Sequence, residues 1–394
     1  MHIKLSEPVV IAMGPETEKT GWGPYQFPEL IQTKDGRLLC NFNVGEDSVT
    51  AYGNARPYFI SSDLGRTWQE ISPKEAACLQ GVLLPNGDVL HYRELPSIPL
   101  EGLTLPQPVC TSPKGFAIYS MEDVAHTPCN KTWEFIRINA ENPQGITEQA
   151  VVHWPHMFVS AAKGVLIRPF PRGRIRVAPD GTLWMPDYCA AGIDPKDGSV
   201  ASNQYSVYLL KSKDFGHTWE LVHFLPYIPK TEKEAVSEGY NENDIGFAPD
   251  GSLFRLIRTH VIYKESAFCP MLISHSADGG NTWSQPEDFD FTGVWPTILT
   301  LKCGVTLATY GRPGLFLRAT DDPACRRWDA PMELIHSNRV PNEPGSTVNV
   351  ATCSYTDMVM LDDRTAGLIY SDFTVKDENG KLRKSILFRT ISVE

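Results

Sequence analysis

An eight-residue pattern of Ser, Asp, Gly, Thr and Trp occurs three times in this chain of 394 residues. The first copy reads SSDLGRTW at 61–68, and the same residue types return at the same offsets at 212–219 and 276–283. Five specified positions out of eight, found three times, identify a structural repeat rather than a coincidence. A chain of this kind builds its fold from copies of one small unit.

A second repeat alternates with the first. Apolar runs flank a two-residue turn signal, and a short β-rich segment such as RLLCNF or SLFRLIR follows each turn. The clear turns are Asp35-Gly36, Asn86-Gly87, Asp180-Gly181 and Asp250-Gly251, with weaker versions at Cys303-Gly304 and Asp362-Asp363. Degraded copies of the eight-residue pattern are predicted at Ser120–Trp133 and Thr320–Trp328.

The two repeats together predict a unit of four antiparallel strands, and six such units are present. We therefore expect an all-β fold, a six-bladed β-propeller of four-stranded antiparallel blades, as a single domain over residues 1–394. The sixth unit lacks its last strand. The N-terminal segment KLSEPVVIA at 4–12 is expected to supply that strand and close the ring.

Turn chemistry accounts for every position of the eight-residue pattern. Its Asp accepts hydrogen bonds from backbone N–H groups, and its Gly takes a positive φ. Its Ser and Thr make further local hydrogen bonds, and its Trp packs between neighbouring blades. The pattern therefore predicts a structural turn on the outer rim rather than part of a ligand site.

Composition excludes several classes of partner. The formal net charge of −11 argues against nucleic acid or an anionic membrane as the main partner. The N-terminal residues have no apolar run typical of a signal peptide, and the nine cysteines are scattered, so a cytoplasmic protein is expected. His153 and His156 form a pair with no evident third ligand, and neither a metal nor another cofactor is expected.

The S-x-D-x-G-x-T-W pattern is similar to the Asp-box, or BNR repeat, of the sialidase (neuraminidase) superfamily. The resemblance covers nearly the whole chain. It implies a propeller whose ligand site lies at one mouth of the central channel. It also implies an exo-acting glycoside hydrolase that cleaves a terminal acidic sugar, either sialic acid or a related ulosonic or uronic acid.

Three stretches resemble the sialidase segments that carry catalytic and binding residues. YNENDIGFAPDGSLFRLIR matches the stretch with the glutamate and the second arginine, at Glu242 and Arg258. TYGRPGLFLR matches the region of the third arginine at Arg312, and CSYTD matches the segment of the tyrosine at Tyr355. The resemblance implies a Tyr355 nucleophile, Glu242 as its proton acceptor, and two arginines that hold the substrate carboxylate.

The first unit departs from the sialidase pattern. The chain reads YQFP at 25–28 where sialidases have a Tyr-Arg-Ile-Pro-like motif, so Gln26 replaces the first arginine. The acid/base aspartate has an approximate counterpart in Asp47, or in its neighbour Glu46. Other polar residues at predicted strand ends complete the candidate binding set: Arg93, Arg174, Asp187 and His260.

Two other functions stay open at the level of sequence. A propeller polysaccharide lyase acting on uronate-containing glycans would use His260 and Tyr355, and its product would absorb in the near ultraviolet. A non-catalytic carbohydrate-binding propeller would bind its sugar without turnover. An acidic mono- or oligosaccharide is the expected partner throughout, and the oligomeric state is open.

Overall fold

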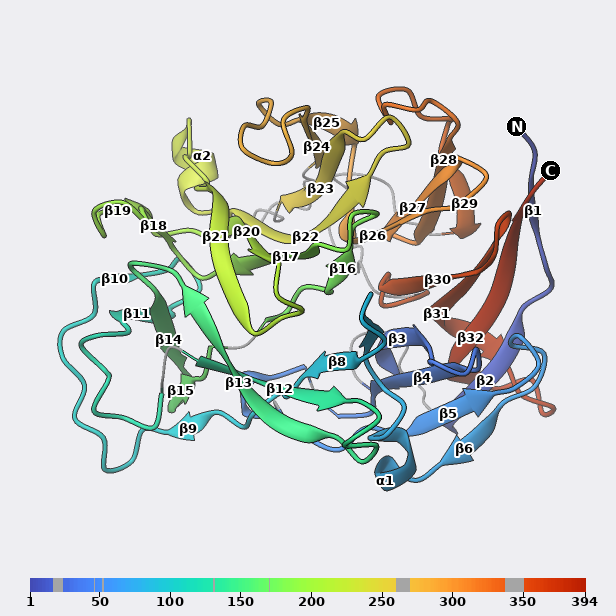
Figure 1. Cartoon of the computed structure of the whole chain (residues 1–394), viewed down its shortest axis with the longest axis horizontal. Coiled ribbons are helices and arrows are strands. Elements are labelled where there is room, and N and C mark those ends of the chain that lie inside the picture. Colours follow the sequence, from blue (N-terminus) through green and yellow to red (C-terminus); the bar gives the residue numbers. More distant parts are fainter. Residues whose placement is uncertain are drawn as a thin grey trace.

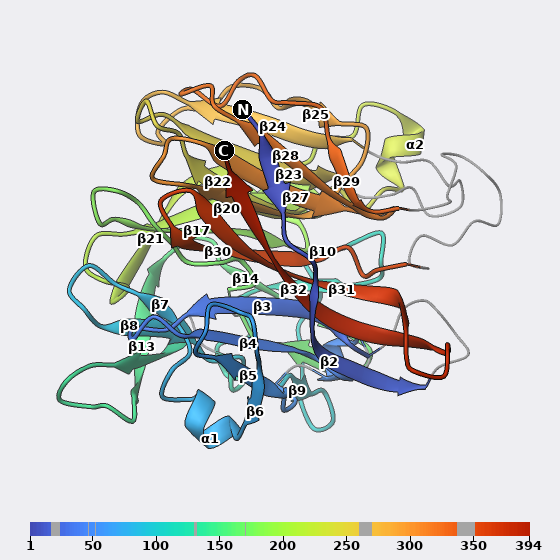
Figure 2. The ribbon, with the colours of Figure 1, turned by 90° about the vertical axis from the view of Figure 1, so that its right-hand side faces the viewer.

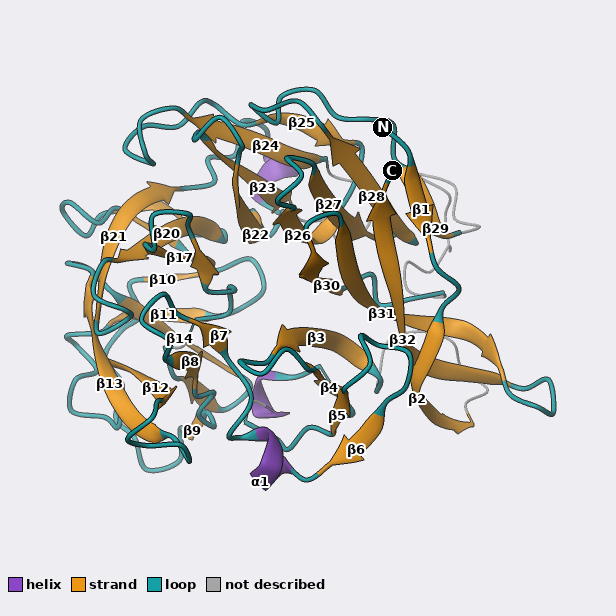
Figure 3. Ribbon diagram, turned by 45° about the vertical axis from the view of Figure 1, so that its right-hand side comes forward, coloured by secondary structure: helices purple, strands orange, loops and turns teal. Residues whose placement is uncertain are grey.

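The computed structural model describes residues 1–16, 24–45, 47–51, 53–129, 132–169, 171–259, 270–336 and 351–394. The predicted all-β class is confirmed: within these residues, small twisted sheets stand around a central axis (Figure 1). Helix in the described residues is confined to short turns, as Figure 3 shows. These turns are η1 (Val49–Ala51), α1 (Pro73–Ala76) and α2 (Glu232–Ala235).

Three sheets of the described chain have the predicted unit, in which each strand pairs with the next one along the sequence. They are β3 (Gln26–Gln32), β4 (Leu38–Asn43), β5 (Tyr58–Ser61) and β6 (Gln69–Ile71); β22 (Tyr240–Phe247), β23 (Leu253–Thr259), β24 (Met271–Ser276) and β25 (Glu287–Asp290); and β26 (Val294–Thr300), β27 (Thr306–Gly311), β28 (Leu315–Thr320) and β29 (Met332–Ile335). The first hairpin of each turns at a glycine of positive φ, namely Gly36, Gly251 and Gly304.

The two ends of the chain share one sheet. Its strands are β30 (Thr356–Asp362), β31 (Thr365–Lys376), β32 (Leu382–Val393), β1 (Ile3–Leu5) and β2 (Val9–Glu16). Strand β32 pairs with β31 along one edge and with both N-terminal strands along the other. The link between β1 and β2 is also held, because Ser6 Oγ accepts a hydrogen bond from the Thr390 N–H at 2.9 Å. The termini therefore lie side by side (Figure 2).

Two further sheets are joined into one. Strands β7 (Val82–Leu83), β8 (Val89–Tyr92), β12 (Thr132–Ile138) and β13 (Ile146–His153) meet β16 (Arg176–Val177), β17 (Leu183–Cys189), β20 (Ser206–Ser212) and β21 (Thr218–Leu225). The junction is a parallel pairing of β13 with β21, in which Val152 lies opposite Trp219. A hairpin of β18 (Gly192–Ile193) and β19 (Val200–Ser202) branches from the second half.

An additional sheet, called here the inserted sheet, interrupts the second unit. Its order is β9 (Ile98–Pro99), β15 (Val165–Ile167), β14 (Phe158–Ala162), β11 (Ala117–Ser120) and β10 (Cys110–Thr111). The degraded repeat predicted at Ser120–Trp133 is therefore wrong. Ser120 ends a strand of the inserted sheet, whereas Trp133 lies in β12 of another, and its indole N–H has no hydrogen-bond partner among the described residues.

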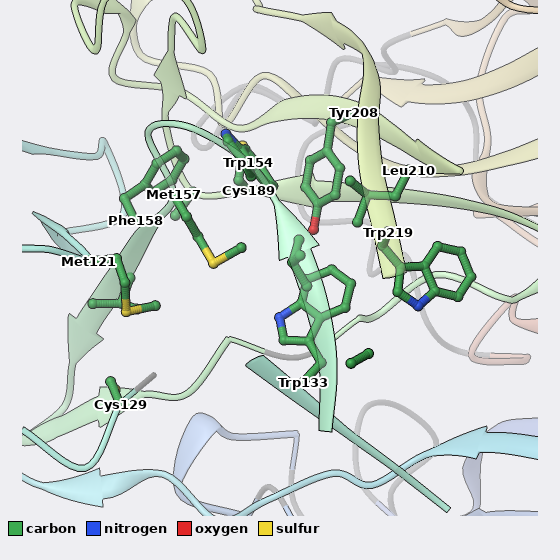
Figure 4. Close-up of a cluster of buried hydrophobic side chains, with 14 of the residues drawn as sticks. Met121, Cys129, Trp133, Trp154, Met157, Phe158, Cys189, Tyr208, Leu210 and Trp219 are labelled. Atoms are coloured by element: carbon green, nitrogen blue, oxygen red, sulfur yellow. The ribbon is translucent and has the colours of Figure 1, made fainter. Parts of the chain in front are cut away.

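Aromatic side chains fill the space between the inserted sheet and the joined sheets (Figure 4). Trp154 packs edge-on against Tyr208, with 4.5 Å between ring centroids, and against Phe158 at 5.9 Å. Trp219 is fully buried and stacks on Phe135 at 6.1 Å. Burial of this much aromatic surface fixes the inserted sheet against the rest of the fold.

The eight-residue repeats form the expected turns. In the copy at 212–219, Asp214 accepts hydrogen bonds from both the backbone and the hydroxyl of Thr218, at 2.9 and 2.7 Å. The Trp219 indole donates to the Gly216 carbonyl at 3.1 Å, and the other two intact copies repeat these bonds. The predicted copy at 320–328 keeps the indole bond from Trp328, which goes to the carbonyl of Cys325 at 2.8 Å.

Each repeat glycine packs against a side chain of a neighbouring unit. A Cβ added to Gly65 would lie within 3.0 Å of Phe388, one on Gly216 would meet Leu90, and one on Gly280 would meet Trp184. Glycine is therefore required at these positions for two reasons: its φ is 89°, and a neighbouring side chain leaves no room for a Cβ. The repeat thus joins consecutive units around the axis.

Candidate functional site

Tyr355 and Glu242 meet at the centre of the candidate site. Tyr355 directly precedes β30 and Glu242 lies in β22, so 113 residues separate them in the chain. The phenolic hydroxyl donates a hydrogen bond to Oε1 of the carboxylate. Both residues are buried, with 8% and 6% of their surface exposed. The fold therefore brings the predicted nucleophile and its predicted proton acceptor into direct contact.

The second oxygen of Glu242 is held by two donors. Arg258 Nη1 in β23 lies 2.7 Å from Oε2, and the Trp295 backbone N–H in β26 donates to the same oxygen at 2.9 Å. Burial alone would raise the pKa of Glu242, but Arg258 and the Tyr355 hydroxyl outweigh it, and the pKa is lowered. Glu242 is thus held as an oriented carboxylate.

Tyr355 keeps its proton. Burial and the negative charge of Glu242 raise the pKa of Tyr355 well above its ordinary value, although Arg258 and Arg312 oppose them. A phenol next to a carboxylate of lowered pKa can attack only as its proton moves to that carboxylate. The pair therefore has the arrangement of an activated neutral nucleophile.

Aromatic rings hold the Tyr355 ring in place. Trp295 stacks on it with 5.0 Å between centroids and 25° between planes, and Phe27 meets it edge-on at 4.6 Å. The Arg312 guanidinium lies 5.8 Å from the Tyr355 ring centroid, and that of Arg174 lies 4.7 Å from the Trp295 ring. The nucleophile is thus fixed by packing as well as by its hydrogen bond.

The backbone is strained around this ring cluster. Five non-glycine residues at the site have a left-handed φ: Tyr25, Phe27, Trp295, Arg312 and Ser354. Register shifts also interrupt β3, β22 and β26 close to their first residues, at the end where the site lies. Each such conformation costs about 1–3 kcal/mol, and such strain is concentrated at functional sites in proteins.

Arg312 and Arg258 make the site electropositive. Arg312 follows β27 and contacts the Cys353 carbonyl, with Nη2 at 3.3 Å from the oxygen. Burial and the neighbouring charge of Arg258 lower the pKa of Arg312, which shows that the two cations interact. Two guanidinium groups beside one carboxylate leave a local excess of positive charge. An anionic group is the ligand that such a site favours.

Gln26 occupies the position expected of a first arginine. It is the first residue of β3, it is fully buried, and neither its amide nitrogen nor its amide oxygen has a hydrogen-bond partner among the described residues. A buried amide without partners costs roughly 1–3 kcal/mol. Its neighbour Phe27 contacts Tyr355. The amide of Gln26 thus keeps a donor and an acceptor that no described residue uses.

Asp47 and Lys114 approach the site from two loops. Asp47 is exposed in the loop after β4, and Lys114 lies in the turn between β10 and β11 of the inserted sheet. Burial and the charges of Arg258 and Arg312 lower the pKa of Lys114 to about 8, whereas Glu242 and Asp47 oppose this. The charges of all four groups therefore act on Lys114. Nothing in the sequence pointed to Lys114, because it lies in an insertion outside both repeats.

Two predicted binding residues, Asp187 and Arg174, have other roles. Asp187 is 1% exposed and accepts hydrogen bonds from the Arg172 and Tyr188 backbone and the Tyr208 hydroxyl, so it is a structural carboxylate. Arg174 pairs with Asp357 at 2.9 Å and supports Trp295 rather than presenting its charge to the Tyr355 hydroxyl.

Arg93 lies on the surface. Its side chain is 52% exposed, and it pairs with Glu134 at 3.4 Å. Arg93 and Arg174 both line a central cavity of about 650 Å³ beside the ring cluster. Arg56, which also lines this cavity, pairs with Glu29 at 2.9 Å and with Glu94 at 3.5 Å. The predictions for Glu46 and His260 fall outside the described residues.

Within the described ranges, no group of three or more His, Cys, Asp or Glu side chains is placed to hold a metal ion. Across the same part of the chain, no helix combines the length and the apolar character that crossing a membrane requires.

Comparison with known proteins gives matches only at the level of structure. No family model matches the chain. No curated protein matches its sequence. A protein of unknown function from Dyadobacter fermentans DSM 18053 has a TM-score of 0.60 at 16% identity, with 100% of this chain and 99% of that chain covered.

Glycosidases are among the matched structures. The NanB sialidase of Streptococcus pneumoniae has a TM-score of 0.51 at 12% identity, covering 98% of this chain and 71% of that one. The α-L-arabinanase of Penicillium chrysogenum, complexed with arabinobiose, has a TM-score of 0.48 at 15% identity, covering 97% and 98%. At such identities the likeness shows the fold alone, and that fold is the sialidase-type β-propeller. The resemblance drawn from the Asp-boxes is confirmed at this level.

Proposed function

We propose that this chain is a retaining exo-glycosidase that cleaves a terminal acidic sugar, with Tyr355 as the nucleophile. The observation that carries the proposal is the hydrogen bond from the buried Tyr355 hydroxyl to Glu242, beside Arg258 and Arg312. A tyrosine nucleophile suits an anomeric centre next to a carboxylate, because a neutral attacking group avoids charge repulsion. Tyrosine is the nucleophile of sialidases.

The proposed first step forms a glycosyl-enzyme. The Tyr355 oxygen attacks the anomeric carbon while its proton passes to Glu242, and the glycosidic C–O bond breaks. The leaving oxygen takes a proton from Asp47. In the second step water attacks the anomeric carbon and gives its proton to Asp47. The bond from that carbon to the Tyr355 oxygen breaks, and this oxygen takes back the proton held on Glu242.

Two cations and one neutral amide would bind the acidic group of the sugar. Arg258 is already committed in part to Glu242, so it would orient the carboxylate of the enzyme and the acidic group of the sugar at once. Arg312 would supply the second guanidinium, and Gln26 would donate one amide hydrogen bond where sialidases have an arginine. A different ulosonic acid is therefore as suitable a substrate as sialic acid, because both have the carboxylate on the anomeric carbon. A uronic acid, whose carboxylate lies away from that carbon, is the alternative substrate.

The proposal includes the architecture. We infer that the sheets form six blades of a single propeller over residues 1–394, with the inserted sheet as an elaboration of the second blade. Strands β1 and β2 would close the sixth blade onto β32. The site then lies where the innermost strands β3, β22, β26 and β30 begin or are about to begin, at one mouth of the channel.

Turnover of acidic aryl glycosides tests the proposal. The panel consists of 4-nitrophenyl glycosides of N-acetylneuraminic, 3-deoxy-octulosonic, glucuronic and galacturonic acid, each with its methyl ester. Tyr355→Phe should remove turnover while binding persists, and Tyr370→Phe, a buried tyrosine of β31, should retain it. A product that absorbs in the near ultraviolet would instead identify a lyase, and binding without turnover by the wild type would identify a lectin.

A further inference from the structure

The inserted sheet carries a lysine to the site on a tight turn. Between β10 and β11, the Gly115 N–H donates to the Ser112 carbonyl at 2.8 Å, and the Phe116 N–H donates to Ser112 Oγ at 3.1 Å. Gly115 has a φ of 80°, which the turn requires. The turn therefore has a defined shape, and Lys114 is the charged residue at its tip.

A buried carboxylate anchors this lysine. The Lys114 ammonium forms an ion pair with Glu238, whose side chain is 1% exposed, whereas the lysine side chain is 31% exposed. The ammonium also lies 5.7 Å from the centroid of the Tyr205 ring. Within the pair, the lysine side chain is therefore the more exposed partner.

The anchor is tied to the strand that holds the catalytic glutamate. The Tyr205 N–H donates to the Glu238 carbonyl at 2.6 Å, and the Tyr240 N–H donates to the Tyr205 carbonyl at 2.9 Å. Tyr240 is the first residue of β22, and Glu242 follows two residues later. Glu238, the ion-pair partner of Lys114, is thus joined by backbone hydrogen bonds to the start of the strand that holds Glu242.

The lysine belongs to the electrostatic environment of the candidate site. The charged groups that act on it are Arg258, Glu242, Asp47 and Arg312, in addition to its partner Glu238. Burial and the two arginines lower the pKa of Lys114 to about 8, so it is a cation at neutral pH and loses its charge above that value. By contrast, the pKa of Glu242 is lowered and that of Tyr355 is raised.

We propose that Lys114 binds the acidic group of the substrate as a third cation beside Arg258 and Arg312. This inference rests on the proposed function. Lys114, which is ion-paired with Glu238 as Arg258 is with Glu242, thereby adds a cationic contact to a site where Gln26 offers only a neutral amide. Lys114 is then a specificity-determining residue that distinguishes an acidic sugar from its neutral ester.

Titration calorimetry on matched sugars tests this inference. The probes are N-acetylneuraminic acid, 3-deoxy-octulosonic acid, glucuronic acid and galacturonic acid, each compared with its methyl ester. Lys114→Met should weaken binding of the acid about 10- to 100-fold and change binding of the ester little, because a charge-assisted contact is lost. Lys163→Met is the matched control, since Lys163 is exposed on another turn of the same sheet.

The pH dependence provides a second readout. For the wild type, affinity for the acid should fall as the pH rises through about 8, where Lys114 loses its charge. Lys114→Arg should keep neutral-pH binding and lose this dependence, because an arginine stays charged.

Failure of the inference can be told from failure of the proposed function. If the wild type binds none of the four acids, the proposed function fails. If it binds one of them and Lys114→Met behaves as Lys163→Met does, with both variants folded by their thermal melts, the role of Lys114 is overturned while the proposed function stands.

Discussion

The phenolic oxygen of Tyr355 and the carboxylate of Glu242 are joined by a hydrogen bond across 113 residues of sequence. Both side chains are held in this orientation by other residues. The carboxylate is oriented by Arg258 and the Trp295 backbone, and the phenol is oriented by Trp295 and Phe27. The pair therefore depends on Arg258, Trp295 and Phe27 for its geometry.

Arg312→Lys tests the recognition of the acidic group. Lysine keeps the charge but loses the planar fork that binds a carboxylate through two parallel hydrogen bonds. We expect about 10-fold weaker binding of an acidic sugar, with the methyl ester little affected, measured by calorimetry. Arg318→Lys is the control, because Arg318 lies in the same sheet and donates to the Asp329 and Phe289 carbonyls. Equal losses for acid and ester would count against a carboxylate contact.

Trp219→Ala tests the structural role of the repeat. Trp219 is fully buried and donates to Gly216, so its removal should lower the free energy of unfolding by about 3–5 kcal/mol. Trp283→Ala, at the same position of another copy, should cost less because Trp283 is only half-buried. Urea unfolding measures both. The folded fraction of either variant should bind sugar as the wild type does, and a changed affinity would assign the repeat to the site.

Deletion of residues 1–12 tests closure of the sheet by the N-terminal strands. The deletion removes β1 and part of β2, which exposes the edge of β32 and the apolar residues beneath it. The melting temperature should fall sharply, as measured by calorimetry. Lys4→Met alters only an exposed ion pair with Glu394 and should leave melting nearly unchanged. A deletion variant that melts like the wild type would show that closure contributes little.

Acid titration tests the charge on Glu242. Its pKa is lowered from the ordinary value of 4.5, so the stability it contributes is present above that value and is lost as the pH falls through the lowered folded value. The free energy of unfolding should therefore be higher for the wild type than for Glu242→Gln, and this difference should be largest near pH 6. The difference should shrink below pH 4.5, as measured by urea unfolding across that range. If the difference in unfolding free energy does not change with pH, the pKa of Glu242 is not lowered in the folded protein.

The repeats made much of the fold predictable. Asp214, Gly216 and Trp219 make the local bonds that their spacing indicated, because a turn is determined by residues near in sequence. The same reasoning failed at Trp133, where the letters KTW resemble the end of a repeat but the preceding strand belongs to the inserted sheet. Pairing partners far apart in sequence decided that case.

The site was predictable only in part. Tyr355, Glu242, Arg258 and Arg312 were found through resemblance to sialidase segments, and the fold brings them together. Trp295 and Lys114 were not found. Trp295 acts through its backbone N–H and its ring, and Lys114 reaches the site from an insertion, so each acquires its place only through long-range packing.

Capture of the covalent intermediate is the most direct measurement of the central proposal. A glycosyl fluoride of the acidic sugar that the wild type hydrolyses, with a second fluorine on the carbon next to the anomeric centre, should slow release of the glycosyl-enzyme. Peptide mass spectrometry after acid quench should then find the sugar on Tyr355, and Tyr355→Phe should remain unlabelled. Labelling of another residue, or an unlabelled wild type that consumes the fluoride, would contradict a Tyr355 nucleophile.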